Sequence, residues 1–232
     1  MSAHGALGYV EKLQCSALFS GVGATELKGL LQYAHRRQFR AQQYIAWQGD
    51  SCGEFYYLLK GFVKLRSRTQ QGKDHTLGVV YPGNFFALEA MFSGNGYATT
   101  MEAIEDCELL AVPSSHFLSF MKHRPILFYK VLSELSHEVV KLYSHIERQK
   151  TYTAQQKIAA WILDHSDQES PQASISVPLL RTDLASLLGI TPETLCRELK
   201  KLKKMGLISG NNGTIAICNY EGLQNILEQE IH

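Results

Sequence analysis

The stretch "LASLLGITPETLCRELKKLKKMGLI", residues 184–208, contains two short amphipathic segments divided by a glycine. Gly189 can adopt the left-handed backbone that commonly ends a helix. Thr191 is a favourable N-cap, and Pro192 suits the first position of a helix, where the amide hydrogen that proline lacks would have no intrahelical partner. The sequence therefore predicts two helices, over residues 179–189 and 191–206, joined by a turn of about three residues.

The flanking residues extend this pattern into a compact domain. Residues 158–163 have helical periodicity, residues 167–174 form a polar loop, and residues 175–178 predict a short strand. After the second helix, residues 207–218 predict a β-hairpin with Asn-Asn-Gly at its tip. A helix, a short turn, a second helix and a hairpin, in that order, make a winged helix-turn-helix.

The second helix of this motif has two chemically different sides. Leu195, Leu199 and Leu202 are spaced to face inward. The opposite side carries Glu193, Cys196, Arg197 and Lys200. Since a recognition helix contacts base edges with its N-terminal residues, the second side is the one expected to face DNA.

We assign base reading to Glu193, Cys196 and Arg197. Arginine can donate two hydrogen bonds to guanine O6 and N7, glutamate can accept one from cytosine N4, and a small thiol can rest against a thymine methyl group. We assign contacts with the DNA backbone to Thr191, Thr194, Lys200 and Lys201. The alternative for Glu193 and Arg197 is a surface ion pair between residues i and i+4 of one helix.

Residues 39–118 have a different pattern, in which short β-prone runs are broken by turn residues. Gly49, Gly61, Gly72 and Gly83 recur at intervals of about 11 residues, a spacing typical of a β-sandwich or a small barrel. Ahead of this region, residues 8–38 have leucines at helical spacing and are predicted to be helical.

Residues 125–149 contain no helix breaker after Pro125. Their apolar residues alternate between spacings of four and three, which is typical of a helix that packs along a partner helix. The simplest partner is the same helix of a second copy, related by a two-fold axis; packing against the helix's own domain is the alternative. The predicted dimer interface comprises Phe128, Leu132, Leu135, Val139, Leu142 and Ile146.

These patterns predict an α+β chain in three parts. Residues 1–124 form a β-rich sensor domain with N-terminal helices, residues 125–150 form a coiled-coil dimerisation helix, and residues 151–232 form a winged helix-turn-helix DNA-binding domain.

The composition is that of an ordinary soluble globular protein, with 232 residues of which 45% are hydrophobic and 19% charged. Because the net charge is only +1, DNA binding has to depend on a local basic patch. The N-terminus lacks the pattern of a signal peptide, and no apolar run approaches the roughly 18 residues of a membrane span. We therefore expect a cytoplasmic protein with no membrane partner.

Chemistries other than DNA binding find little support in the sequence. The five cysteines are widely spaced and form no Cys-x-x-Cys pair, which argues against a disulfide framework and against a zinc site. There is no P-loop, no Gly-x-Gly-x-x-Gly and no serine–histidine–aspartate pattern. The predicted strands offer His75 alone, too few histidines for a cupin-type metal cluster. We expect no enzymatic activity; the competing class is a small-molecule-binding β-roll protein or enzyme without specific DNA binding.

Together these motifs resemble the Crp/Fnr superfamily of bacterial transcription regulators over nearly the whole chain. The strings "WQGDSCGEFYYLLKGFVKL" (residues 47–65) and "GKDHTLGVVYPGNFFALEAMF" (residues 72–92) are similar to the superfamily's cyclic nucleotide-binding β-roll, which is a jelly roll, and residues 184–208 are similar to its helix-turn-helix. The resemblance implies a homodimeric, effector-controlled DNA-binding protein that works with RNA polymerase. It also implies that Glu193 and Arg197 occupy the superfamily's two base-reading positions.

In the effector region this chain departs from the members that bind cyclic AMP. Those members carry a Gly-Glu pair for the ribose hydroxyl and an Arg-Ser or Arg-Thr pair for the cyclic phosphate, and the matching positions here are Ala87-Leu88 and Ala98-Thr99. A buried cyclic phosphate without its cation would be costly. Glu89 lies one position away and is expected to face the other way.

The long helix also differs from that of the members that bind cyclic AMP, since Leu142 and Tyr143 stand where those members would place a polar pair in contact with adenine. We therefore expect an effector other than cyclic AMP, and a cyclic nucleotide-responsive regulator is the alternative. The residues assigned to the effector pocket are Leu88, Glu89, Ala98, Thr99 and Leu142.

Other branches of the superfamily suggest other cofactors. An iron–sulfur cluster would need closely spaced N-terminal cysteines, and only Cys15 lies in that region. Residues 85–100 contain neither cysteine nor histidine, unlike the carbon-monoxide-sensing haem members. "FFALEAMF" and the Pro-Glu-Thr of the recognition helix better resemble regulators of nitrosative stress and anaerobic respiration, several of which are thought to bind haem and sense nitric oxide. Haem is therefore a candidate cofactor with unknown ligands, since His145, Met91 and Met101 make no ligand pattern.

A two-fold dimer predicts an inverted-repeat DNA site with half-site centres about one helical turn apart. The resemblance suggests a T-G-A core, as in TTGAT or TGTGA. Members of the cyclic AMP type carry a second arginine where Pro192 stands, and proline has no side-chain donor. We therefore favour a TTGA-type half-site.

Overall fold

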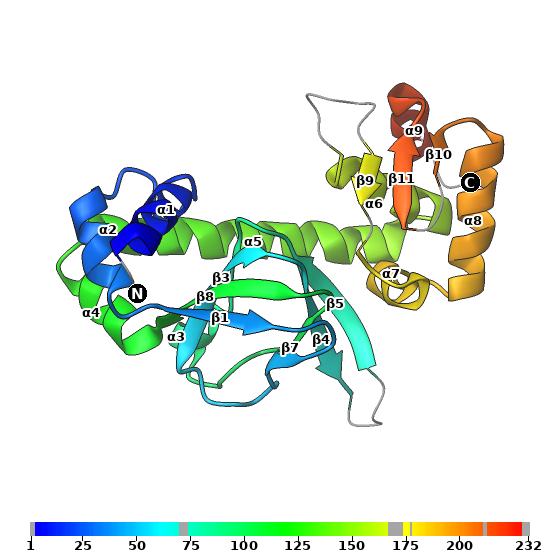
Figure 1. Ribbon diagram of the computed structural model, residues 1–232. Helices are drawn as coiled ribbons and strands as arrows, with labels where there is room; N and C mark the ends of the chain where they lie inside the picture. Colours follow the sequence, from blue (N-terminus) through cyan, green and yellow to red (C-terminus); the bar gives the residue numbers. More distant parts are fainter. Residues whose placement is uncertain (1–2, 70–73, 167–173, 177, 211–212, 229–232) are drawn as a thin grey trace. The chain divides into compact units, whose positions relative to one another are not determined.

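The computed structural model describes residues 3–69, 74–166, 174–176, 178–210 and 213–228. The chain divides into two compact units, an N-terminal unit of residues 1–141 and a C-terminal unit of residues 142–232. Figure 1 shows their elements in chain order. Each unit is described by itself.

The N-terminal unit is built on two four-stranded antiparallel sheets, which confirms the predicted β-roll. The strand orders are β1-β8-β3-β6 and β2-β7-β4-β5. The strands are β1 (His35–Phe39), β2 (Tyr44–Ala46), β3 (Glu54–Lys60), β4 (Val63–Arg68), β5 (Asp74–Val80), β6 (Phe85–Phe86), β7 (Thr100–Ala103) and β8 (Cys107–Pro113).

Strands β3 and β8 are buried on both faces. Successive side chains of a strand point to opposite faces, and in β8 Leu110 and Val112 join one buried cluster while Leu109 and Ala111 join another. The adjacent β3 divides its side chains between the same two clusters. The sheet containing these strands therefore separates two apolar cores, which explains why its central strands are almost continuously hydrophobic.

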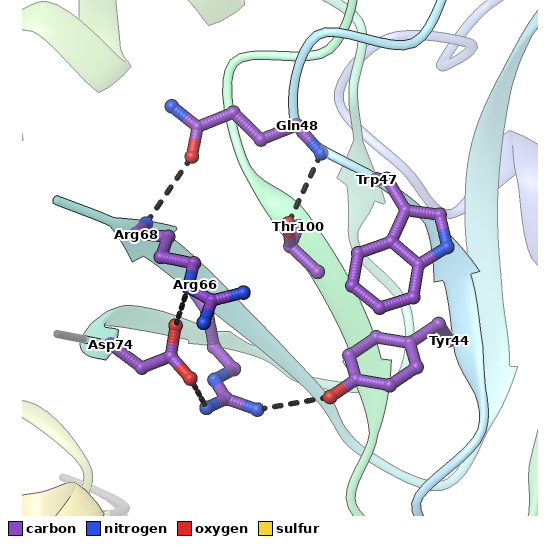
Figure 2. A pocket seen from close by; sticks show the side chains of 7 residues that line it. All are labelled: Tyr44, Trp47, Gln48, Arg66, Arg68, Asp74 and Thr100. Carbon is purple, nitrogen blue, oxygen red and sulfur yellow. Dashed lines mark hydrogen bonds and ion pairs between the residues drawn. The ribbon is translucent and has the colours of Figure 1, made fainter. Parts of the chain in front are cut away.

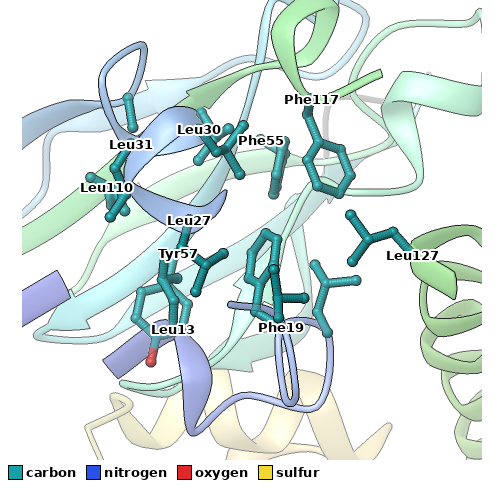
Figure 3. Packing of buried hydrophobic residues seen from close by; sticks show 14 of the residues in the cluster. Leu13, Phe19, Leu27, Leu30, Leu31, Phe55, Tyr57, Leu110, Phe117 and Leu127 are labelled. Carbon is teal, nitrogen blue, oxygen red and sulfur yellow. The ribbon is translucent and has the colours of Figure 1, made fainter. Parts of the chain in front are cut away.

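The first of these cores lies under the N-terminal helices. It joins α1 (Ala3–Gln14), α2 (Ala24–Leu31) and α4 (Ser114–Lys122) to β3 and β8, as Figure 3 shows. Phe117 of α4 lies 4.8 Å from Phe55 and 5.9 Å from Phe19 between ring centroids, and all three rings are fully buried. Burying a side chain of this size contributes about 1.5–3 kcal/mol.

The prediction of helix throughout residues 8–38 is wrong in two places. Residues 15–23 form turns after α1, where the Ser16 hydroxyl donates a hydrogen bond to the Leu13 carbonyl at 2.5 Å. Residues 35–39 form β1, which pairs with β8 from His35–Ala111 to Phe39–Cys107. Pairing with a distant strand therefore decides the structure of a segment whose local spacing favours helix.

Helix α5 (Pro125–Thr151) is 27 residues long and has two apolar sides. On one side Leu127 and Val131 are buried in the core of the N-terminal unit, and Leu135 packs partly against it. On the other side Phe128, Leu132, Val139, Leu142 and Ile146 are 46–63% exposed. Of the predicted interface residues, only Leu135 packs on the helix's own domain, next to Leu127 and Val131. The other five predicted interface residues are left uncovered.

The C-terminal unit has the predicted winged helix-turn-helix fold. Its helices are α6 (Ala154–Asp164), α7 (Arg181–Leu188), α8 (Pro192–Lys204) and α9 (Tyr220–Leu227). Its strands β9 (Ser174–Ser176), β10 (Ile208–Ser209) and β11 (Thr214–Ile217) form an antiparallel sheet of order β10-β11-β9. The hairpin pairs Ile208 with Ile217, while its Asn-Asn tip and residues 167–173 of the polar loop lie outside the described residues.

Helix α9 was not anticipated from the sequence. Asn219 caps it by accepting a hydrogen bond from the Gly222 amide at 2.8 Å. Leu223 and Ile226 are its buried residues, so an asparagine cap followed by helical apolar spacing was available as evidence for it.

Candidate nucleic-acid interface and effector region

The turn between α7 and α8 has the geometry that the sequence predicts. Gly189 ends α7 with a φ of 63°, and the Ile190 amide donates to the Ala185 carbonyl at 3.0 Å. The Thr191 hydroxyl accepts a hydrogen bond from the Thr194 amide at 3.2 Å, and Pro192 occupies the first helical position. These local interactions fix where α8 begins.

One side of α8 is buried against α6 and α7. Leu195 and Leu202 are fully buried there and Leu199 is partly buried. The other side carries Glu193, Arg197 and Lys200, all exposed, and Cys196, which is half-buried. The residues assigned to base reading therefore share one accessible side.

The remaining residues assigned to DNA lie along the same helix. Thr191 and Lys201 are exposed and Thr194 is half-buried. Arg181 of α7 donates from Nη1 to the Cys196 Sγ at 3.6 Å. Hydrogen bonds from the backbone amide of Glu193 and from the Thr191 hydroxyl lower the pKa of the Glu193 carboxyl.

The guanidinium of Arg197 pairs with Glu198, not with Glu193. Its Nε lies 3.0 Å from Glu198 Oε1, and the Lys201 Nζ lies 3.0 Å from the same oxygen. Burial raises the pKa of Glu198, but the hydrogen bonds from Lys201 and Arg197 outweigh that effect and hold the pKa below its ordinary value. Glu198 lies three residues after Leu195 and four before Leu202, on the same buried side of α8. The helical spacing of these leucines could therefore have indicated a buried carboxylate.

The last turn of α5 contacts the helix-turn-helix directly. Gln149 donates to the Leu187 carbonyl at 3.3 Å and accepts from the Lys157 Nζ at 3.0 Å. A Cβ atom added at Gly189 would lie 2.4 Å from the Gln149 Oε1. Position 189 therefore requires glycine both for its backbone angle and for the close approach of Gln149.

The residues assigned to the effector pocket occupy different environments. Leu88 is buried in the core under the N-terminal helices. Glu89 is exposed just before α3 (Ala90–Ser93), Ala98 is exposed, and Thr99 is half-buried. Leu142 is exposed on α5. Ala87, which stands where the resemblance places a glycine, has a left-handed backbone with a φ of 62°.

A separate cleft of about 300 Å³ lies on the sheet β2-β7-β4-β5, and Figure 2 shows the side chains that line it. The rings of Tyr44 and Trp47 stack at a centroid distance of 4.0 Å. Arg66 forms ion pairs with Asp74 and Glu102, each at 2.5 Å. Its charge is therefore already balanced, and none of the residues assigned to the effector pocket lines this cleft.

The side chains considered as haem ligands do not converge on one cavity. Met91 packs on the core under the N-terminal helices, whereas Met101 belongs to the core on the other side of that sheet. His145 lies on α5 in the C-terminal unit, where burial, Arg148 and Lys157 lower its pKa. Among the described residues no group of three or more histidine, cysteine, aspartate or glutamate side chains could hold a metal ion. These three residues therefore do not fit a pair of axial haem ligands.

Comparison with known proteins agrees with the two units. Residues 36–124 match the cyclic nucleotide-binding domain family and residues 156–226 match the Crp-like helix-turn-helix domain family. The nitrogen fixation regulation protein FixK of Bradyrhizobium diazoefficiens is 25% identical over 211 residues, which is 89% of this chain and 88% of that protein. The cyclic AMP receptor protein of Thermus thermophilus is 25% identical over 212 residues, covering 91% and 96% of the two chains.

The structure of FixK2 from Bradyrhizobium japonicum has the same fold, with a TM-score of 0.76 at 22% identity, over 86% of this chain and 98% of that one. A cyclic nucleotide-binding domain followed by a Crp-like helix-turn-helix defines a two-domain DNA-binding transcription regulator. The chain belongs to the Crp/Fnr family of such regulators. No helix in the part of the chain that the structure describes is long and apolar enough to cross a membrane.

Replacing Gly189 with alanine should destabilise the C-terminal unit by about 1–3 kcal/mol, because alanine is strained at this φ and its methyl group displaces Gln149. Gly206→Ala is the matched control, since Gly206 has a φ of 69° and no atom within 4 Å of an added Cβ. The loss of stability in Gly189→Ala should exceed that in Gly206→Ala by about 1 kcal/mol, the value of a lost hydrogen bond. This excess should vanish when Gln149 is replaced by alanine. Urea unfolding followed by Trp161 fluorescence, with Trp47 replaced by phenylalanine, measures both losses. Equal losses in the two variants would contradict the role of Gln149.

Proposed function

We propose that this DNA-binding transcription regulator acts as a cytoplasmic homodimer on inverted-repeat sites, works with RNA polymerase, and responds to an effector other than cyclic AMP. In this proposal residues 1–124 are the sensor, residues 125–150 the dimerisation helix and residues 151–232 the DNA-binding domain. The observation that carries it is the exposed side of α8, where Glu193, Cys196 and Arg197 lie together at the start of a capped helix.

The exposed side of α5 supports the dimer. Leu132, Val139 and Ile146 are spaced by seven residues and are 47–63% exposed. A second row flanks them, in which Phe128 and Leu142 are exposed and Leu135 is partly covered by the N-terminal unit. Apolar residues in two such rows are covered when a second helix packs along them. A two-fold pair presents two copies of α8 and so requires a symmetric DNA site.

Val139→Glu should convert the dimer to monomer while leaving the protomer folded. Val139 is 47% exposed in the protomer, so the charge is tolerated until a partner helix buries it, at which point it costs several kcal/mol. His137→Glu, a substitution at another exposed position of α5, is the control and should leave the dimer intact. Sedimentation velocity distinguishes the two states, and a Val139→Glu dimer of normal mass would refute the interface.

For the DNA, selection from random sequences should yield an inverted repeat with a TTGA-type half-site. Arg197→Ala should cost about 1–3 kcal/mol and remove the preference for one guanine, because a bidentate donor is lost. Lys200→Ala should weaken binding to all sequences alike and reduce the salt slope by about one. A consensus without an inverted repeat, or one unchanged by Arg197→Ala, would rule out this assignment.

The first candidate effector is nitric oxide bound to haem, because "FFALEAMF" is similar to a segment of nitrosative-stress regulators. The haem would need ligands other than His145, Met91 and Met101, which do not converge on one cavity. The match to a cyclic nucleotide-binding domain favours a second candidate, a cyclic nucleotide. Against cyclic AMP stand the buried Leu88 and the small Ala98, neither of which can pair with a ribose hydroxyl or a phosphate.

Calorimetric titration should therefore show weak cyclic AMP binding or none, and micromolar affinity would overturn the interpretation of Leu88 and Ala98.

An absorption spectrum after haem reconstitution, with and without nitric oxide, tests the first candidate, and a spectrum of unbound haem would exclude it. The true effector should change DNA affinity by about 1–3 kcal/mol, the usual range of allosteric coupling.

A further inference from the structure

A carboxylate is buried on the inward side of the recognition helix. Glu198 lies between Leu195 and Leu202, and its side chain is only 6% exposed. Within the described part of the chain, Glu198 and Lys64 are the only charged residues that are buried, with 5% and 9% of their surface exposed. An apolar residue at position 198 would pack without the desolvation that a carboxylate suffers, so the charge at this position calls for an explanation.

The partners of this carboxylate are two cations assigned to DNA. One oxygen, Glu198 Oε1, accepts from Arg197 Nε and from Lys201 Nζ, each at 3.0 Å. The side chains of the cations are 61% and 54% exposed. Glu198 therefore contacts both side chains from the buried side of α8, and the charged ends of Arg197 and Lys201 remain accessible.

The contact made by Arg197 leaves its reading end available. A guanidinium has five N–H donors, and the bond from Nε uses one of them. Nη1 and Nη2 can still donate end-on to O6 and N7 of a guanine. Fixing the side chain before DNA arrives reduces the rotamer freedom that is lost on binding and confines the guanidinium to a small region of the groove.

We propose that Glu198 is a positioning residue, which holds Arg197 in the orientation for reading guanine and so raises base discrimination without touching DNA. The inference rests on the proposed function of Arg197. The positioning role lowers the affinity for DNA of any sequence, because the Glu198 carboxylate neutralises one of the two positive charges beside it.

This mechanism predicts opposite changes in two measurements. Glu198→Gln keeps the shape of the side chain and removes its charge. Affinity for unrelated DNA should then rise a few-fold, and the salt slope should steepen by up to about one, because one more positive charge faces the phosphates. Discrimination between the selected site and a site with its guanine–cytosine pair replaced by adenine–thymine should fall on the order of tenfold, because Arg197 is no longer held.

The experiment measures binding of the full-length protein to the selected, substituted and unrelated duplexes over a series of salt concentrations. Glu221→Gln, which removes an exposed carboxylate on α9, is the control for net charge and should leave discrimination unchanged. Lys201→Ala should also preserve discrimination, because the bond between Arg197 and Glu198 remains. Because Arg197 and Lys201 are more than half exposed, removing Glu198 leaves no uncompensated buried charge. Glu198→Leu therefore provides a second variant, and it should lose discrimination as Glu198→Gln does.

Arg197→Ala separates this inference from the proposed function. If that variant keeps the full base preference, Arg197 does not read the base and the proposed function fails. If Arg197→Ala loses the preference while Glu198→Gln and Glu198→Leu retain it, base reading stands and the positioning role is overturned. If both Glu198 variants bind all three duplexes more weakly, Glu198 has only a structural role and the inference is also overturned. Glu198→Gln should have no further effect on discrimination once Arg197 is alanine.

Discussion

Helix α5 has two apolar sides, and only one of them is covered within the chain. Leu127 and Val131 anchor the helix in the core of the N-terminal unit, while Leu132, Val139 and Ile146 face outward. Water in contact with a long apolar stripe is unfavourable, so the stripe favours association with a second copy. The two-fold symmetry of that association would determine the symmetry of the DNA site, and the proposals about function therefore depend on this helix.

A second constraint acts on the recognition helix, because one side of it packs in an apolar core and the other side is exposed to solvent. Leu195 and Leu202 secure it to the domain, and the opposite side stays free for a polyanion. A basic helix of this kind attracts every phosphate, so selectivity needs something that limits the movement of its cations. Glu198 contacts Arg197 and Lys201 from the buried side of the helix, and in its proposed role it supplies this limit.

Where local chemistry decides the structure, the sequence was a sufficient guide. Gly189, Thr191 and Pro192 each obey a rule that depends on a few neighbouring residues, and the turn forms as expected. The β-roll was predictable because turn residues recur at regular intervals. Residues 35–39 were misassigned because their partner, β8, lies about 70 residues away and leaves no trace in their own spacing.

The same distinction applies to the sites. Glu193, Cys196 and Arg197 could be placed on one side of a helix from periodicity alone. Glu198 was missed because a glutamate next to an arginine is typical of a solvated surface. The cleft around Arg66 could not be predicted, because it forms only when β2, β4, β5 and β7 align. The residues assigned to an effector pocket came from the resemblance alone, and they do not share one environment, since Leu88 is buried in a core and Ala98 is exposed.

The length of α5 has a mechanical consequence. Its 27 residues rise by about 1.5 Å each, so the helix is about 40 Å long. If two copies of this helix pair, a change of about 5° in the angle between them would displace their far ends by about 3.5 Å, which is close to the spacing of successive base pairs. In such a pair, a small change in packing near one end of the helix would grow along its length to about the size of one base step.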